Sequence, residues 1–417
     1  MNPYLIAVLA FLILPALLQA VAEILNLRAI REDIPTEFQG WYDAEKYAAA
    51  QRYLRESTRF ELFQHGVTLV LQAAFILLGG FAAVDQWARA LGWGMIPTGL
   101  AFTGALILLT TLLSLPFSIY ETFRIEAKYG FNRTTPGTFA RDQVLGLVLT
   151  AVIGAPALAG ILWFFARAGS SAWLYAWAAM FLLQMALMYL APRFIMPLFN
   201  KFTPLPAGEL RTAIEGYAER EKFTLRDLFT MDGSKRSARA NAFFTGFGRN
   251  RRVVLYDTLV ARHPVPELLA VLAHEIGHFK LRHIPKFIAV SAATSFLMFA
   301  LLSVFIAEPR LYAAFGGTFD SIGAQPPLYA GLVFFLFLLA PLNLLLSLAL
   351  NRASRKHEFE ADAFAARTTG TPAALADALR RLSVDNLSNL SPHPLLVALE
   401  YSHPPVLQRI RALNGQG

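Results

Sequence analysis

Residues 264–286 read PVPELLAVLAHEIGHFKLRHIPK and contain the motif His-Glu-x-x-His at His274, Glu275 and His278. Pro266 stands where the first turn of a helix tolerates proline. Two histidines four residues apart lie on one face of a helix, where both imidazoles can bind one metal ion. The stretch therefore predicts a helical metal site, with Glu275 beside the position that a catalytic metal leaves open for water.

Apolar residues indicate that one side of the predicted helix is buried. They are Leu268, Leu269, Val271, Leu272, Ile276 and Phe279. The histidine pair is therefore expected in a core or a cleft, not on a solvated helix. A chance match to the motif is the alternative interpretation, and this buried setting weakens it.

A catalytic metal needs a third protein ligand, which the residues directly after the motif do not supply. The metzincin pattern would place glycine and histidine at the positions of Leu281 and Ile284. His283 is one residue short of the final position. The third ligand is therefore expected from another part of the chain.

The best candidate segment is RASRKHEFEADAFAAR, residues 352–367. Glu358 and Asp362 are four residues apart, on one face of a predicted helix. One carboxylate can bind the metal while the other orients a histidine ligand by a hydrogen bond. From spacing alone, Glu358 is more simply explained as a solvated charge next to Arg355 and Lys356.

The composition predicts a membrane protein, because 55% of the 417 residues are hydrophobic and only 16% are charged. Windows without charged residues, each long enough to cross a bilayer, lie near residues 4–22, 62–84, 97–119, 143–166, 171–191, 287–307 and 328–350. The first is interpreted as a retained span, because it lacks the basic leading region and the cleavage site of a signal peptide.

The distribution of Lys and Arg predicts the orientation in the membrane. The connections after the second, fourth and sixth windows carry essentially Arg89, Arg167 and Arg310 alone, whereas the other connections are rich in basic residues. The basic side is expected to be cytoplasmic, with the N terminus outside and the C terminus inside. Both parts of the metal site then lie on the cytoplasmic side. This bias and anionic lipid headgroups explain the net charge of +8, so no nucleic-acid partner is expected.

Several stretches resemble the M48 metallopeptidases, and specifically the Ste24 CAAX prenyl protease branch. HEIGH is followed about 80 residues later by SRKHEFEAD. The other matching stretches are LPFSIYETFRIEAKYGFNRTT at 115–135, PRFIMPLFNKFT at 192–203, GSKRSARANAFFTG at 233–246 and YSHPPVL at 401–407. The shorter heat-shock M48 branch is a weaker alternative, because it does not account for seven spans or for the YETF and PLFNKF segments.

The resemblance implies a mainly α fold, in which a barrel of seven transmembrane helices encloses a chamber and carries a cytosolic gluzincin-like zinc peptidase domain. It implies one Zn²⁺ held by His274, His278 and Glu358, with Asp362 orienting a ligand. It places His403 at the active site, where it can stabilise the oxyanion. Without the resemblance, His403 would be taken for a structural loop histidine.

Residues 239–260 are predicted to form two short strands joined by a turn at residues 248–250, within a small β-hairpin or sheet. An edge strand beside the metal helix could hold an extended substrate, although an ordinary packed hairpin explains the pattern equally well. The resemblance favours the substrate edge, with Asn241 near the cleft.

These observations predict four segments. They are transmembrane helices 1–5 with their loops (1–193), a cytosolic metallopeptidase segment (194–286), transmembrane helices 6–7 (287–350) and a cytosolic C-terminal segment with the third ligand (351–417).

The predicted function is that of an integral-membrane zinc endopeptidase that cleaves near the C terminus of CAAX-like, possibly prenylated, peptides or of membrane-associated proteins, with Glu275 as general base. A quality-control protease without CAAX specificity is one alternative. A non-enzymatic transporter or scaffold with a structural zinc is the alternative from another class. The Ala- and Arg-rich composition without Cys favours a bacterial inner membrane over an endoplasmic reticulum membrane, with lipids and a peptide or protein substrate as partners.

Overall fold

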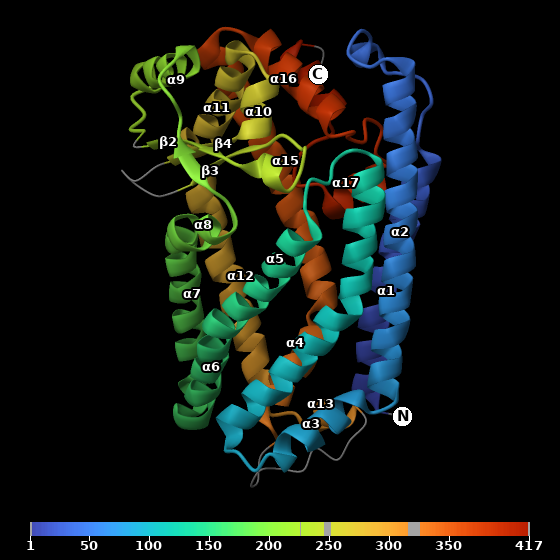
Figure 1. Ribbon diagram of the computed structural model, residues 1–417. Coiled ribbons are helices and arrows are strands. Elements are labelled where there is room, and N and C mark those ends of the chain that lie inside the picture. Colours follow the sequence, from blue (N-terminus) through green and yellow to red (C-terminus); the bar gives the residue numbers. More distant parts are fainter. Residues whose placement is uncertain (1, 226, 246–251, 316–325, 416–417) are drawn as a thin grey trace.

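The computed structural model describes residues 2–225, 227–245, 252–315 and 326–415, and it is mainly helical (Figure 1). Six segments are long and apolar enough to cross a membrane. They are α1 (Pro3–Arg28), α2 (Ala44–Leu77), Met95–Glu126 (α4, Met95–Tyr120, and a π-helical turn), Pro136–Arg167 (mainly α5, Pro136–Leu149, and α6, Ala155–Arg167), Gly169–Phe199 (mainly α7, Ala172–Leu190, and α8, Met196–Phe199) and α12 (His283–Phe305).

The seventh predicted span is broken. It consists of α14 (Leu328–Leu338) and α15 (Ala340–Thr369), which are bent by 52° relative to each other. Pro341 lies in the first turn of α15, where a proline ring cannot continue the hydrogen-bond ladder of a preceding helix. The window 328–350 is therefore covered by a bent pair of helices, which can together form the seventh span. The second half of the pair extends well past residue 350 and carries Glu358.

The second predicted span also ends earlier than expected. The helix α2 ends at Leu77, and Gly79 takes a left-handed conformation with φ of 74° before α3 (Gly80–Ala90) begins. Glycine adopts this conformation without the steric cost of a side chain. Residues 80–84 of the window therefore belong to a separate short helix.

The part of the chain outside the spanning segments contains a four-stranded sheet in the order β1 (Phe202–Pro204), β2 (Asp227–Met231), β4 (Arg252–Tyr256) and β3 (Ala242–Thr245). The β2–β4 pair is parallel, and the other two pairs are antiparallel. Strands β3 and β4 are the two predicted strands, whereas the predicted turn lies outside the described residues. β3 is an edge strand and contacts the motif helix α11 (Val265–Lys280).

The remaining helices are α9 (Glu209–Arg220), α10 (Asp257–Arg262), α13 (Pro309–Ala313), α16 (Pro372–Asp385), α17 (Pro394–Glu400) and α18 (Val406–Leu413). The motif helix α11 packs against α9, α15 and α16. Leu268, Leu272 and Ile276 are buried in this core, which confirms the predicted apolar face. Figure 1 shows this soluble core at one end of the molecule with the C terminus, and the N terminus at the other end.

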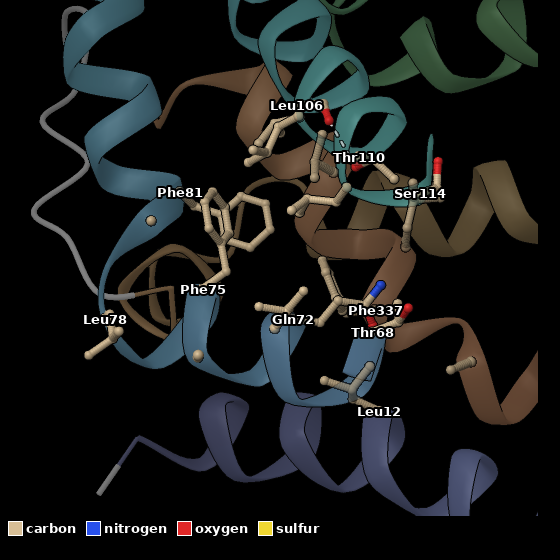
Figure 2. Close-up of a pocket in the computed structure, with 18 of the residues that line it drawn as sticks. Leu12, Thr68, Gln72, Phe75, Leu78, Phe81, Leu106, Thr110, Ser114 and Phe337 are labelled. Carbon is tan, nitrogen blue, oxygen red and sulfur yellow. Dashed lines mark hydrogen bonds between the residues drawn. The ribbon is translucent and has the colours of Figure 1, made fainter. Parts of the chain in front are cut away.

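A cavity of about 800 Å³ lies among α1, α2, α4 and α14 (Figure 2). Its wall is mostly apolar, with Leu12, Phe75 and Phe337 on it, and Thr68 and Gln72 add polar groups. These four helices therefore leave a cavity between them.

The cavity is distant from the metal motif. Ala340 lines it and is 18 residues before Glu358 on α15, which corresponds to about 27 Å along the helix. This cavity is therefore separate from the chemistry described next.

Candidate metal centre

The motif histidines and Glu358 form one cluster between α11 and α15. The Nε2 atoms of His274 and His278 are 3.1 Å apart. The Glu358 Oε2 atom is 3.4 Å from His274 Nε2, and its Oε1 atom is 3.2 Å from His278 Nε2. His274 and Glu358 are buried and His278 is half-buried. The structure thus brings together the three predicted ligands from two distant parts of the chain.

The donor atoms have the spacing of a tetrahedral metal site. A metal ion held at about 2.0–2.1 Å by each donor places tetrahedral donors roughly 3.3–3.4 Å apart. The two Nε2 atoms are 3.1 Å apart and each is 3.2–3.4 Å from one of the two Glu358 oxygens, which is close to this value. Glu358 Oε2 is buried and accepts no hydrogen bond from the described residues, as expected of an atom reserved for a metal. Three protein donors leave one position for water or substrate, which is typical of a catalytic site.

Gly277 allows α11 and α15 to approach closely enough to form the cluster. A Cβ atom at this position would lie 3.2 Å from the Cα and carbonyl oxygen atoms of Ala361, and 3.2 Å from the Phe364 ring. Two of these three atoms belong to the backbone of α15 and cannot rotate away. The glycine of HEIGH therefore fixes the distance between the histidines and Glu358.

Replacing Gly277 by Leu is expected to separate the two helices and to reduce the bound metal at least tenfold, although Gly277 is not a ligand. Metal analysis of the purified protein measures the effect. Gly216→Ala is the matched control, because Gly216 is also helical and a Cβ there would meet nothing within 4 Å. Full metal occupancy in Gly277→Leu would contradict the role of this close contact.

Asp362, the predicted orienting carboxylate, contacts the ring of His274. Its Oδ1 atom is 2.8 Å from His274 Nδ1, on the opposite side of the ring from the cluster. Burial lowers the pKa of His274, but the nearby carboxylates of Asp362 and Glu358 raise it more, to about 9. The imidazole therefore lies between two carboxylates, whose negative electrostatic potential also favours a bound cation.

Arg409 is a site residue that sequence reasoning missed. The guanidinium is buried on α18 and donates two hydrogen bonds to Asp362, with N–O distances of 2.8 and 2.6 Å. Burial lowers its pKa, whereas Asp362, Glu358 and Glu275 raise it, and the raising effects are larger. In sequence, Arg409 is three residues after Val406, on the apolar side of a short helix. An arginine on such a face is the signal that could have indicated a buried partner.

Replacing Arg409 by Met is expected to lower the free energy of unfolding by about 3–5 kcal/mol, because it leaves the buried Asp362 carboxylate without its counter-charge. The thermal unfolding midpoint in detergent measures the effect. Arg411→Met on the same helix is the control, because Arg411 is half-exposed beside Glu37 and an exposed pair contributes at most about 1 kcal/mol. Equal midpoints for the two variants would contradict the assignment.

The other predicted site residues are His403, Glu275 and Asn241. His403 Nε2 is 3.4 Å from Glu358 Oε1, and 63% of the His403 side chain is exposed. Glu275 is half-buried and follows His274 on α11. Asn241 is exposed directly before β3 and lines a cavity of about 580 Å³ that also reaches Pro404 and Arg409. Asn241 is therefore next to the cluster's supporting residues and is not itself part of the cluster.

The sequence matches two family descriptions that together cover most of the chain. Residues 23–201 match "CAAX prenyl protease N-terminal, five membrane helices", and residues 204–416 match "Peptidase family M48". The boundary between the two matches falls where the spanning segment Gly169–Phe199 ends and β1 begins.

Proteins named CAAX prenyl protease 1, or its homologue, are similar over nearly the whole chain. The Arabidopsis thaliana protein is 36% identical, and the match covers 99% of this chain and 98% of that protein. The Saccharomyces cerevisiae and Homo sapiens proteins are each 35% identical, covering 91% of this chain and 88% of each relative. The crystal structure of S. mikatae Ste24p superposes with a TM-score of 0.94 at 33% identity, covering 99% of this chain and all of that one.

Proposed function

The chain belongs to the M48 peptidase family as an integral-membrane metallopeptidase of Ste24 type, and on this basis we propose that it is a zinc enzyme whose reaction takes place at the cluster of His274, His278 and Glu358. The observation that carries the proposal is the cluster itself: the two Nε2 atoms are 3.1 Å apart, and each is 3.2–3.4 Å from one of the two Glu358 carboxylate oxygens. Two imidazoles and one carboxylate are a common ligand set of catalytic zinc.

Family membership excludes two of the alternatives raised by the sequence. A peptidase is not a non-enzymatic transporter or scaffold. The match of residues 23–201 to the CAAX prenyl protease N-terminal helices, and relatives that align over the full length, also exclude the shorter heat-shock branch.

Each residue of the centre has a separate task in the proposed reaction. When bound, zinc lowers the pKa of its water to about 7 and polarises the peptide carbonyl. Glu275 accepts a proton from the attacking water and transfers it to the leaving amine. His403, on the exposed side of Glu358, donates a hydrogen bond to the oxyanion that develops on the carbonyl oxygen. Asp362 and Arg409 hold His274 in place.

The substrate class is proposed from the names of the relatives and from the edge strand. The relatives are named CAAX prenyl proteases, and we extend peptide cleavage near the C terminus of prenylated CAAX peptides to this chain. β3 has a free edge in the described sheet and contacts α11, so an extended peptide can add to it by main-chain hydrogen bonds. Asn241, directly before β3, is placed to contact such a peptide.

The active site is proposed to face the cytoplasm. Most of the basic residues lie in the loops that join the spanning helices at the same end as the metal centre. Loops rich in Lys and Arg favour the cytoplasmic side of a membrane. On this view residues 194–286 and 351–417 form one cytosolic unit between and after the spanning segments.

The proposal is tested with detergent-purified protein, a farnesylated CAAX peptide and the same peptide without the lipid. We expect one zinc per chain, cleavage of the farnesylated peptide, loss of cleavage after removal of the metal with a chelator, and recovery when zinc is added back. Equal cleavage of both peptides would contradict specificity for prenylated CAAX peptides and would favour a quality-control protease of broader specificity. Zinc without cleavage of either peptide would contradict the proposed substrate class.

A further inference from the structure

The second metal ligand, His278, has a hydrogen-bond partner that neither the motif nor the comparisons assign. His278 Nδ1 is 3.0 Å from Nδ1 of His283, and His283 Nε2 is 3.0 Å from Glu360 Oε2. His283 is fully buried at the start of α12. A continuous chain of polar contacts therefore runs from the metal cluster through two imidazoles to a carboxylate on α15.

The positions of the protons in this chain follow from the ring chemistry. His278 directs Nε2 at the cluster, so a neutral ring that binds metal there carries its proton on Nδ1. Nδ1–H then donates to His283 Nδ1, which must be an acceptor. The proton of His283 is left on Nε2, where it donates to Glu360. Each nitrogen thus has one role, and only one tautomer of each ring satisfies all the contacts.

We propose that His283 is a positioning residue that holds His278 in its metal-binding tautomer and orientation, with Glu360 fixing His283 in turn. The inference rests on the metal site of the proposed function. Metal-bound histidines usually donate their second N–H to a carboxylate, a carbonyl or water, and loss of that partner weakens metal binding 10- to 100-fold. His274 has such a carboxylate in Asp362, whereas His278 reaches one through a second imidazole.

The backbone between α11 and α12 is shaped to bring His283 to this place. Arg282 has a left-handed conformation with φ of 58°, which is unfavourable for a residue with a side chain. This turn ends α11 at Lys280 and starts α12 at His283, only five residues after the ligand that it contacts. The strain at one residue is offset by a buried contact at the next.

A second metal site is the competing explanation, because His283, His357 and Glu360 present three donor atoms close together. The rings of His283 and His357 are stacked, with centroids 4.0 Å apart and planes inclined by 14°. Imidazole lone pairs lie in the ring plane, so those of two nearly parallel rings do not converge on one ion. The stacking instead supports His283 from its flat side, which suits a positioning role.

The experiment measures metal affinity by competition with a chelator at constant pH, and does not depend on activity. We expect His283→Ala to bind zinc 10- to 100-fold more weakly than the wild type. His283→Asn should restore most of the affinity, because the Asn Oδ1 atom can take the position of His Nδ1 and accept the same proton. Glu219→Ala, which changes an exposed residue on α9 outside this chain of contacts, is the control and should match the wild type.

The visible spectrum of the cobalt-substituted protein gives a second readout that a purely structural role would not change. We expect it to shift in His283→Ala and to return toward the wild type in His283→Asn. Unchanged affinity and spectrum in His283→Ala would overturn the inference. A second bound metal that disappears in His357→Phe would also overturn it, in favour of a two-metal site. A wild-type chain that binds no metal would overturn the proposed function as well.

Discussion

Replacing Glu275 by Gln is expected to lower kcat for peptide hydrolysis by about 10³-fold or more while one metal ion stays bound to each chain. The amide has nearly the shape of the carboxylate but cannot accept the proton of the attacking water. Glu275 is not among the three clustered donors, so the ligand set of the metal remains intact. Parallel metal analysis and single-turnover cleavage of a farnesylated CAAX peptide measure the two quantities.

The matched control for this prediction is Glu219→Gln, which changes an exposed glutamate on α9 and should leave both quantities unchanged. Substantial metal-dependent turnover in Glu275→Gln would contradict the role of Glu275 as general base. Loss of the metal in this variant would show that the residue acts on the ligand set instead of on the proton.

The local parts of the metal centre could be predicted from the sequence, because helical spacing determines them. His274 and His278 share a face of α11 through their spacing of four, and Glu358 and Asp362 share a face of α15 in the same way. Spacing alone could not decide whether Glu358 binds the metal or is a solvated charge on the helix surface. That assignment needed the resemblance to a family, and it depends physically on the close approach of two helices at Gly277.

Contacts between distant segments could not be predicted in this way. Arg409 reaches Asp362 from a helix 47 residues later, and no local pattern encodes which buried partner an arginine meets. The same holds for His283, whose role depends on the turn at Arg282 and on Glu360. These residues complete the centre because separate helices meet there, so the three-dimensional structure was needed to find them.

Hydropathy predicted where the chain is apolar but not where the helices break. The windows at 62–84 and 328–350 each contain a change of direction, at Gly79 and before Pro341. Hydropathy averages the composition over about 19 residues, whereas these breaks depend on the backbone preferences of one or two residues.

Replacing Glu358 by Gln is expected to weaken zinc binding by more than about 100-fold, which exceeds the loss typical of a supporting partner. The variant replaces a negatively charged carboxylate ligand by a neutral amide, which is a much weaker zinc ligand, and two histidines alone hold zinc poorly. Binding measured with a chelator of known affinity tests the loss, and turnover should disappear with the metal at ordinary zinc concentrations.

Asp362→Asn is the informative comparison, because the two carboxylates have different partners. Asp362 neutralises the buried Arg409 through two hydrogen bonds, whereas Glu358 is 3.5 Å from that guanidinium and makes no hydrogen bond with it. Asp362→Asn should therefore weaken zinc binding less than Glu358→Gln but lower the thermal unfolding midpoint of the metal-free protein more. If instead Asp362→Asn lost more zinc than Glu358→Gln, Asp362 would be the ligand and Glu358 the support. The assignment of the two carboxylates thus depends only on which variant loses more zinc affinity. The absolute size of either loss is not needed.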